Sequence, residues 1–358
     1  MMAEPTNSCF KKNIVVLGGS YGGVSVAHYL LKRVLSRLPS QDKYQVVLVS
    51  PSVQVMCRPA CPRALISDDM FPQDKLFVGI LFAFKSYANN TFRFLRGTAT
   101  SMAHVNRIIT VNLMNNEGTN TLAYHAPIIA TGASTPSPLL GLNCDSEYLR
   151  RSWAEFRKAL PKTKSIVIAG GGPAGVETAG EFGEYLNGRA GWSRSILENP
   201  KTAITLVTAA SEILPALRPA IARKAENYLA KVGVSVLKGV RVENVHPAVA
   251  GVEEVAAKAT ITLDNGKTLE ADLYIPATGT ISNTNFIDSS LLLSDGRTNT
   301  NPSTLRVDKA GPRVYAIGDA SSFARPAIHN TLSAIPALCS NIKRDLHLAS
   351  ENSELAES

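Results

Sequence analysis

Two glycine-rich turns carry the residue pattern of this chain that is most specific for a chemical task. Each turn ends an apolar, β-branched stretch, at residues 14–17 and 166–169. In such a turn the first glycine permits a sharp bend, a small residue lets the backbone approach a pyrophosphate, and the last glycine lets the next helix pack on the strand. The free N–H groups and positive dipole end of that helix attract phosphate, so the pattern predicts two dinucleotide sites. The predicted binding residues are Gly18, Gly19, Ser20, Tyr21, Gly22, Gly23, Gly170, Gly172, Pro173, Ala174 and Gly175.

The elements that must position these turns occur twice along the chain. Apolar residues at helical spacing follow each turn, and a short β-branched stretch follows each helix. Both copies end in Ala-Thr-Gly, at residues 130–132 and 277–279. The predicted elements are helices over 27–38 (ended by Pro39), 176–186 and 221–232, and strands over 44–49, 165–169, 203–207 and 234–237. This duplication predicts an α/β fold with two Rossmann-like, three-layer βαβ domains.

Composition and charge narrow the class of protein. The 358 residues, 45% of them hydrophobic and 18% charged, are enough for two domains with buried cores. The net charge is +8, but no run of five basic residues and no zinc-finger pattern occurs, so we expect no nucleic-acid partner. Residues 76–84 are the most apolar stretch, and because a membrane span needs about twenty residues we expect a core segment. Without a signal peptide or transmembrane segment, we expect a cytoplasmic protein; a peripheral membrane contact stays open.

Cysteine and histidine spacing indicates neither a disulfide framework nor a metal site. Five scattered cysteines favour a reducing compartment. Cys57 and Cys61 are separated by three residues, so they are either a redox dithiol or, as we favour, two small loop residues. His125, His329 and His347 lack ligand spacing, and we expect no metal.

The full set of motifs resembles a known superfamily. Two glycine turns, two Ala-Thr-Gly endings, the Gly-Val-Glu at 175–177 and the late Gly318-Asp319 are similar to those of the two-dinucleotide-binding-domain flavoproteins, the pyridine nucleotide-disulfide oxidoreductase superfamily. Pro62-Arg63 and the segment 275–279 resemble the fungal apoptosis-inducing-factor-like group, related to ferroptosis-suppressor-type NAD(P)H:quinone oxidoreductases. The resemblance covers about residues 12–345.

The resemblance implies a division of labour within the chain. The first turn would hold FAD, with Asp319 accepting hydrogen bonds from the ribitol side, and the second would hold NADH or NADPH. The FAD-binding domain would be discontinuous, over 11–142 and 282–347, with the NAD(P)H-binding domain inserted over 143–281. A polar tail would occupy 348–358, and the C-terminal segment is shorter than is usual in the family.

Some residues have a role implied by the resemblance and a plain alternative. Glu177 matches the family's Gly-Val-Glu and would act at the stacked rings by orienting the carboxamide; the alternative is a favourable acid in the first turn of a helix. Arg63 would approach flavin or phosphate, or form a loop salt bridge. Arg325 would place positive charge near the flavin pyrimidine or, as we favour, be a solvated loop residue. The further cofactor-binding residues expected are Ser50, Arg63, Thr131, Gly132, Glu177, Thr208, Gly279, Gly318 and Asp319.

Two positions depart from the dinucleotide fingerprint. Where an acid is expected to bind the ribose, Ser50 stands in the first copy and Thr208 in the second. A hydroxyl carries no charge to repel a 2′-phosphate, and no arginine follows Thr208 closely, so NADH and NADPH both stay open.

The function expected is hydride transfer from NAD(P)H through FAD to a quinone or another small organic acceptor. One alternative is a flavin-dependent tailoring step in a secondary-metabolite pathway. The other is a non-catalytic, apoptosis-inducing-factor-like effector or binding protein. The oligomeric state is left open.

Overall fold

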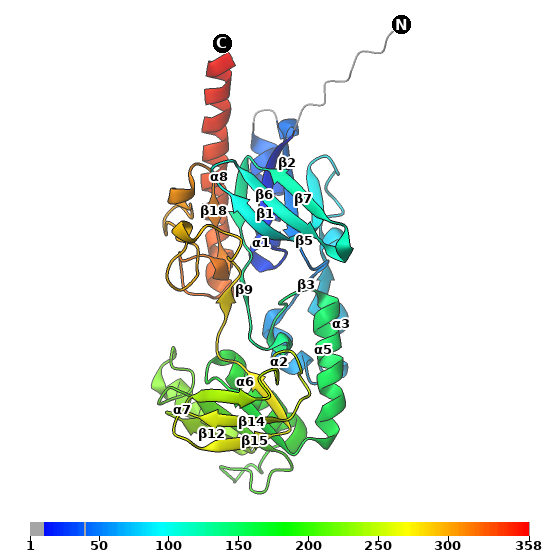
Figure 1. Cartoon of the computed structure of the whole chain (residues 1–358), viewed down its shortest axis with the longest axis vertical. Coiled ribbons are helices and arrows are strands. Elements are labelled where there is room, and N and C mark those ends of the chain that lie inside the picture. Colours follow the sequence, from blue (N-terminus) through cyan, green and yellow to red (C-terminus); the bar gives the residue numbers. More distant parts are fainter. Residues whose placement is uncertain (1–10, 39–40, 358) are drawn as a thin grey trace. The chain divides into compact units, whose positions relative to one another are not determined.

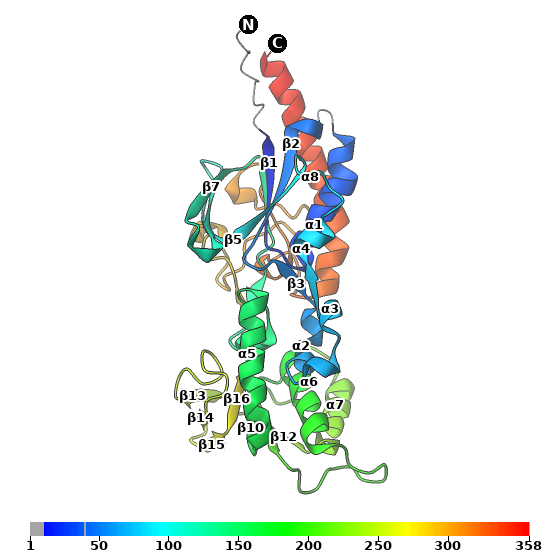
Figure 2. The same cartoon turned by 90° about the vertical axis from the view of Figure 1, so that its right-hand side faces the viewer.

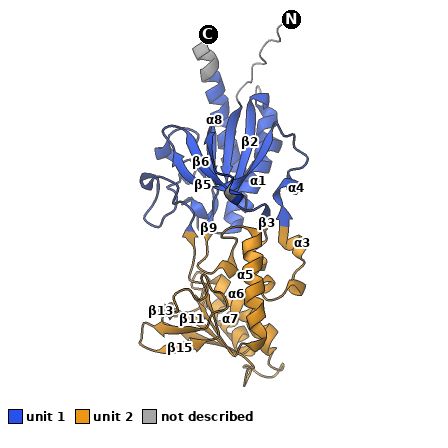
Figure 3. Ribbon diagram, turned by 45° about the vertical axis from the view of Figure 1, so that its right-hand side comes forward, with its two compact units in different colours: residues 1–55, 78–133, 282–358 blue, residues 56–77, 134–281 orange. Residues whose placement is uncertain are grey.

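The chain folds as two units in a computed structural model that describes residues 11–38 and 41–357. Unit 1 comprises Met1–Val55, Val78–Ala133 and Ser282–Ser358, and unit 2 comprises Met56–Phe77 and Ser134–Ile281 (Figure 3). Neither unit is one continuous piece of sequence. Residues 56–77 belong to unit 2, whereas they were expected in the FAD-binding domain over 11–142.

Unit 1 is built on a seven-stranded sheet of order β18-β8-β1-β2-β5-β6-β7 (Figure 1). The strands from β18 to β5 pair in parallel, and β5, β6 and β7 pair in antiparallel fashion. Because parallel strands end at the same edge, the residues that follow them gather there. The strands are β1 (Lys12–Leu17), β2 (Tyr44–Ser50), β5 (Phe92–Ala103), β6 (Ile108–Leu113), β7 (Thr119–Ala123), β8 (Ala126–Ile129) and β18 (Tyr315–Ala316).

Both faces of the central strands are covered, as their continuous apolar sequences predict. On one face Ile14 and Val16 pack with helices α1 (Tyr21–Tyr29) and α8 (Ile328–Glu357), which lie on the same side of the sheet in Figure 2. On the other face Val15 and Leu17 pack with side chains of β5 to β7 and of residues 286–310. Unit 1 is therefore layered as helices, sheet, and a cover of strands and loops.

Helices α1 and α8 differ from the sequence expectation at their ends. The helix that begins with α1 continues as a π-helix over Leu30–Val34, and Pro39 lies outside the described residues. Helix α8 runs through the region expected to be a polar tail and contains Pro336. Its buried Asp345 accepts hydrogen bonds from Arg306 Nε at 2.8 Å and Tyr315 Oη at 2.5 Å, which tie the helix to the sheet.

Unit 2 repeats the plan on a smaller scale. Its parallel sheet has the order β12-β11-β10-β16, beside a separate antiparallel sheet β13-β14-β15. The strands are β10 (Ser165–Ala169), β11 (Ala203–Thr208), β12 (Val234–Lys238), β13 (Val242–His246), β14 (Ala259–Leu263), β15 (Thr268–Ala271) and β16 (Leu273–Pro276). The helices are α5 (Ser146–Ala159), α6 (Pro173–Phe182), with a π-helix over Gly183–Asn187, and α7 (Pro219–Lys231).

Residues 56–77 add two short helices to unit 2, α2 (Cys61–Ala64) and α3 (Gln73–Leu76). Leu65 and Leu76 are fully buried in the core of this unit. Arg157 of α5 donates to the carbonyls of Ala64 and Leu65 and ion-pairs with Asp68. These contacts give the segment a fixed place on α5.

The apolar stretch 76–84 is only partly the core segment that its sequence predicts. Ile80 of α4 (Ile80–Ala83) is buried, but Leu81 and Phe82 are exposed by 61% and 66%. Two pairs of short strands lie where the chain passes between units, β3 (Gln54–Met56) with β4 (Phe77–Gly79) and β9 (Ala133–Ser134) with β17 (Ile281–Ser282). None of the described helices combines the length and apolarity that crossing a membrane requires.

Candidate functional site

The two glycine turns have nearly the same geometry. Gly18 has φ +117° and Gly170 has φ +121°, and a Cβ atom on either would lie 2.2 Å from a backbone oxygen of the Ala-Thr-Gly segment in its own unit. The last glycines, Gly23 and Gly175, approach the first so closely that a Cβ would lie 1.7 and 1.9 Å from its oxygen. Only glycine fits at these positions, so each helix packs directly on the end of its strand.

Both helices that follow the turns begin without a side-chain cap. Ser20 is the N-cap of α1 and its exposed hydroxyl makes no capping hydrogen bond; Gly172 is the N-cap of α6 and has no side chain to cap with. Pro173 at the first position of α6 has no N–H to satisfy. Neither first turn contains an acid, so the N–H groups and the dipole are available to an anion. Both turns therefore fit the pyrophosphate of a dinucleotide.

Ser50 and Thr208 occupy equivalent buried places beneath the turns. A Cβ on Gly19 would lie 2.4 Å from Ser50 Oγ, and one on Gly171 would lie 2.5 Å from Thr208 Oγ1. Ser50 Oγ donates to the carbonyl of Ser52 at 3.0 Å, and Thr208 Oγ1 accepts from the backbone N–H of Ala210 at 3.3 Å. Each hydroxyl is thus engaged with the loop after its strand. Their predicted contact with ribose stays a prediction.

In unit 1 the Ala-Thr-Gly segment is fixed to the chain that returns from unit 2. Thr131 Oγ1 donates to the carbonyl of Asn283 at 2.7 Å, and Asn283 Nδ2 donates back to the carbonyl of Thr131 at 3.1 Å. The backbone N–H of Asn283 donates to the carbonyl of Gly132. Thr131 and Gly132 are thereby held at the carboxyl end of β8. Asn283 was not among the predicted site residues, because its partner Thr131 lies 152 residues away and no local pattern marks the contact.

The late Gly-Asp motif lies beside the first glycine turn. Gly318, with φ +77°, and Asp319 follow β18, and the neighbouring Ile317 N–H donates to the carbonyl of Ile129 at the end of β8. A Cβ on Gly22 would lie 3.7 Å from Ile317 Cγ2 and 3.3 Å from Thr331 Cγ2 of α8. The structure therefore brings the predicted residues of unit 1 to one edge of its sheet.

In unit 2 the second turn follows β10, Thr208 is the last residue of β11, and Gly279 follows β16, so all three lie at the carboxyl edge of the sheet. Gly279 is exposed with φ +114°, and a Cβ atom added to it would meet no other atom within 4 Å. Glu177 is the fifth residue of α6, so it lies beyond the first turn in which an acid interacts best with the helix dipole. Partial burial of its carboxyl group and the like charge of Glu181 raise its pKa.

Arg63 forms the salt bridge that the sequence left as an alternative. Its Nε and Nη2 donate to both carboxylate oxygens of Glu181, at distances of 2.8 to 3.1 Å. Glu181 lies one helical turn after Glu177 on α6. The Arg63–Glu181 ion pair therefore determines the charge near Glu177, and we assign Arg63 to this ion pair in unit 2.

The cysteine pair in unit 2 has the features of packing residues. Cys61 is 2% exposed and its Sγ donates to the carbonyl of Leu139 at 3.3 Å. Burial raises the pKa of the Cys61 thiol to about 12, so little thiolate forms at neutral pH. These observations favour the interpretation of Cys57 and Cys61 as small loop residues.

Comparison with known proteins gives the family. Residues 12–340 match the pyridine nucleotide-disulphide oxidoreductase family. The chain belongs to that family. Oxidoreductase phnG of Penicillium herquei is 61% identical over 350 residues, covering 98% of this chain and 83% of that protein. Ferroptosis suppressor protein 1 of Mus musculus is 24% identical over 342 residues, covering 90% and 78%.

The fold agrees with that of solved members. The water-forming NADH oxidase from Lactobacillus brevis, bound to NADH, superposes with a TM-score of 0.69 at 16% identity, over 93% of this chain and 69% of that one. The predicted superfamily and the α/β Rossmann-like fold are confirmed. The chain is an FAD-dependent NAD(P)H oxidoreductase, with FAD and a nicotinamide nucleotide as cofactors.

Proposed function

We propose that this oxidoreductase passes electrons from NAD(P)H to a quinone or another small organic acceptor, with FAD in unit 1 and the nicotinamide nucleotide in unit 2. The observation that carries the proposal is the pair of matching turns, each closed by glycines against its own Ala-Thr-Gly segment and each opening an uncapped helix. In unit 1 the carboxylate of Asp319 follows β18 beside the turn, which suits the hydroxyl-rich ribitol of FAD.

When bound, FAD would supply the redox chemistry that links the nicotinamide to the acceptor. The residues of the chain bind and orient. The turns at Gly18 and Gly170 hold pyrophosphates through backbone N–H groups, and Asp319 accepts hydrogen bonds from ribitol. Glu177, on the helix after the second turn, accepts a hydrogen bond from the carboxamide when its carboxyl group is ionised. A pKa raised above the ordinary value brings that ionisation closer to neutral pH.

A spectrum tests the redox assignment. Anaerobic NADH or NADPH should bleach the yellow absorbance of the FAD-loaded protein, and quinones should restore it. A purified protein that neither retains nor takes up FAD would end the proposal.

A matched pair of variants tests which unit holds which cofactor. Ser20 and Gly172 are both N-caps in extended backbone, Ser20 is exposed, and a Cβ on Gly172 meets no atom within 4 Å. Valine at either position should therefore leave the fold intact while filling space that a pyrophosphate needs. Ser20→Val should weaken FAD binding about tenfold and spare NAD(P)H binding. Gly172→Val should weaken NAD(P)H binding about tenfold and spare FAD binding. The displaced pyrophosphate would lose about one hydrogen bond, and a hydrogen bond to a charged group is worth about that much. The opposite pattern would reverse the assignment.

A second candidate is a single tailored organic substrate, as in a secondary-metabolite pathway. The uncharged, internally bonded Ser50 and Thr208 favour a specialised family member. Turnover of one pathway intermediate with no turnover of simple quinones would support this candidate over the first.

A further inference from the structure

The outer side of helix α7 in unit 2 combines apolar and basic side chains. Its inner side chains belong to the core of the unit. A row at helical spacing alternates between the two kinds of residue: Ile221, Lys224, Tyr228 and Lys231. Ile221 and Tyr228 are exposed, although both are large and apolar. Lys224 Nζ lies 5.9 Å from the centroid of the Tyr228 ring, so these two side chains are neighbours on the surface.

A loop is fixed to the C-terminal end of this row. The backbone N–H of Ala190 donates to the carbonyl of Lys231 at 2.8 Å, and that of Leu197 donates to the carbonyl of Ala230 at 3.0 Å. Between these two anchors the loop projects from unit 2, below α7 in Figure 2. The helix and the loop together form a surface that we call the α7 surface. It comprises residues 188–201 and 217–231.

Exposed apolar side chains gather on the α7 surface. Trp192, which lies between the two anchors of the loop, is 96% exposed. Ile196 in the same loop and Leu217 just before α7 are exposed as well. Large apolar groups that are grouped in this way on a surface mark a contact with a partner, because their exposure to water is unfavourable.

The α7 surface also carries most of the net charge of the chain. It contains seven lysine and arginine residues and two acids, a net charge of +5 against +8 for the whole chain. Both acids, Glu198 and Glu226, form ion pairs. Five of its cations take part in none of the ion pairs among the described residues: Lys201, Arg218, Arg223, Lys224 and Lys231. Uncompensated positive charge therefore lies beside the exposed apolar groups.

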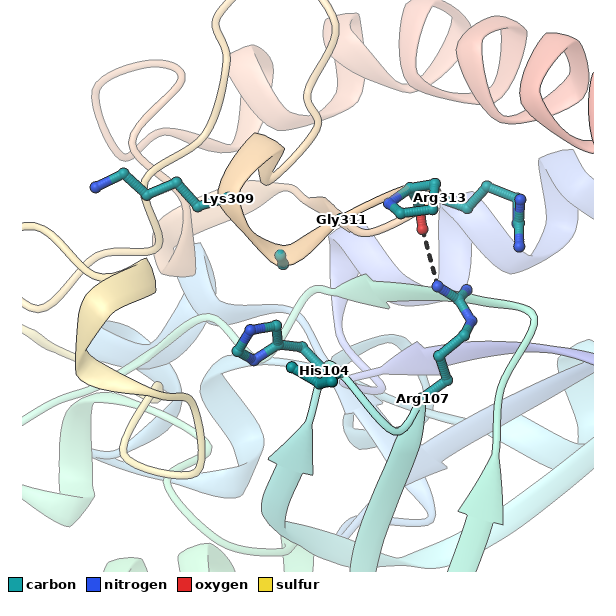
Figure 4. Close-up of a pocket in the computed structure, with 8 residues that line it drawn as sticks. His104, Arg107, Lys309, Gly311 and Arg313 are labelled. Carbon is teal, nitrogen blue, oxygen red and sulfur yellow. Dashed lines mark hydrogen bonds between the residues drawn. The ribbon is translucent and has the colours of Figure 1, made fainter.

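The cations of a basic pocket in unit 1 serve the fold instead (Figure 4). All three nitrogen atoms of the Arg107 guanidinium donate to backbone carbonyls, and the bond to Pro312 is the dashed line in Figure 4. Arg313 Nε donates to the carbonyl of His125 at 3.1 Å. Burial, followed by the charge of Arg313, lowers the pKa of His125 to about 3. The cationic groups of Lys309 and Arg313 point away from each other, so they do not converge on one ligand.

We propose that the α7 surface attaches the protein to an acidic phospholipid bilayer. Anionic headgroups attract grouped lysine and arginine residues, and tryptophan prefers the boundary between headgroups and acyl chains. Because the inner side of α7 is used in the core, the helix stays at the level of the headgroups while Trp192 and Ile196 enter the boundary. A nucleic acid would meet the charges but would leave Ile196 and Ile221 in water, so the combination favours a bilayer.

Cosedimentation of the FAD-loaded protein with vesicles at low ionic strength tests the proposal. The vesicles contain phosphatidylcholine with or without phosphatidylserine. Combined Lys224→Gln and Lys231→Gln substitutions remove two charges of the row and keep good helix formers. Trp192→Ser removes the exposed apolar group of the loop.

A matched control lies on the opposite face of unit 2. In β10, Ile166 and Ile168 belong to the core that α7 covers, whereas Val167 belongs to the core of the antiparallel sheet β13-β14-β15. Alternate residues of a strand point to opposite faces, so that sheet lies on the other side from α7. Arg241 and Lys267 precede β13 and β15 and are exposed there. Combined Arg241→Gln and Lys267→Gln substitutions therefore remove the same charge from another place.

The wild type should bind the acidic vesicles and leave the neutral vesicles in solution. Each cation near an acidic bilayer is worth about fivefold in the binding constant, so the Lys224 and Lys231 double variant should bind about 20–30 times more weakly. Trp192→Ser should lose about tenfold. The Arg241 and Lys267 double variant should bind like the wild type.

Tryptophan fluorescence is a second readout. Of the two tryptophans of the chain, Trp153 is buried and Trp192 is exposed. Acidic vesicles should shift the emission to shorter wavelength, and Trp192→Phe should abolish this shift while vesicle binding continues. No binding to acidic vesicles, equal losses in the two double variants, or binding without a shift would overturn the proposal. Retention on immobilised heparin without vesicle binding would overturn it too, because the charge alone would then explain the surface.

Discussion

Replacement of Asp345 by asparagine should destabilise unit 1, because it removes one buried negative charge from α8. The Asp345 side chain is 8% exposed, whereas its partner Arg306 is 30% exposed. Arg306 donates to both carboxylate oxygens and Tyr315 donates a third hydrogen bond. Asparagine leaves the guanidinium without a counter-charge and keeps only part of this network.

The magnitude follows from that burial. Removal of one partner of a fully buried ion pair costs about 3–5 kcal/mol. Because Arg306 can still reach water, we expect a cost below this range, about 2–3 kcal/mol in the free energy of unfolding. For a domain of this size that corresponds to a fall in Tm of roughly 5–10 °C. Since α8 packs on α1, FAD retention should weaken as well.

Thermal and urea unfolding of the FAD-loaded protein measure the effect. Asp295→Asn is the matched control, because Asp295 and Arg297 form a similar pair in unit 1 with side chains exposed by 48% and 25%. Its cost should stay below about 1 kcal/mol. A double-mutant cycle with Arg306→Met isolates the coupling. Equal losses in Asp345→Asn and Asp295→Asn, or a coupling energy near zero, would refute the reasoning.

Two further predictions concern pH. Glu181→Gln removes the like charge that helps to raise the pKa of Glu177, so the acidic limb of NAD(P)H binding should move to lower pH. Arg63→Met removes the positive charge that compensates Glu181, so the same limb should move to higher pH. Coincident pH profiles of the two variants would contradict the role of Glu177. The pKa of His125 is depressed from 6.5 to about 3, so its contribution to stability is present above pH 6.5 and is lost as the pH falls towards 3. Between pH 6 and 4 the wild type should lose about 1 kcal/mol per pH unit more than His125→Gln, as measured by urea unfolding.

Local signals in the sequence predict the sheets and the glycine turns correctly. The strands at 44–49 and 165–169 are continuous apolar stretches, and the two turns have the expected glycines. Helix α5 also has a local signal, although it is not among the predicted helices. Asp145 caps its N-terminus, and Leu149, Trp153 and Phe156 follow at helical spacing on its buried face.

Contacts between distant residues could not be read from local patterns. Arg63 and Glu181 are 118 residues apart, so the sequence allows an ion pair without naming the partner. The place of residues 56–77 depends in the same way on Arg157 of α5. Likewise, Arg107 donates a hydrogen bond to the carbonyl of Pro312, 205 residues later. Tertiary packing determines which distant residues form such pairs, and local sequence propensities carry no information about them.

The discontinuity of the units has a consequence for synthesis on the ribosome. Residues 56–77 emerge early, yet the core that buries Leu65 and Leu76 includes Ile275, which emerges some two hundred residues later. Likewise, the sheet and core that contain β1 and β2 are incomplete until β18 and α8 have been synthesised. Because domains complete in the order in which their parts emerge, unit 2 should finish first, while nascent unit 1 keeps apolar surface open to chaperones until β18 and α8 have emerged.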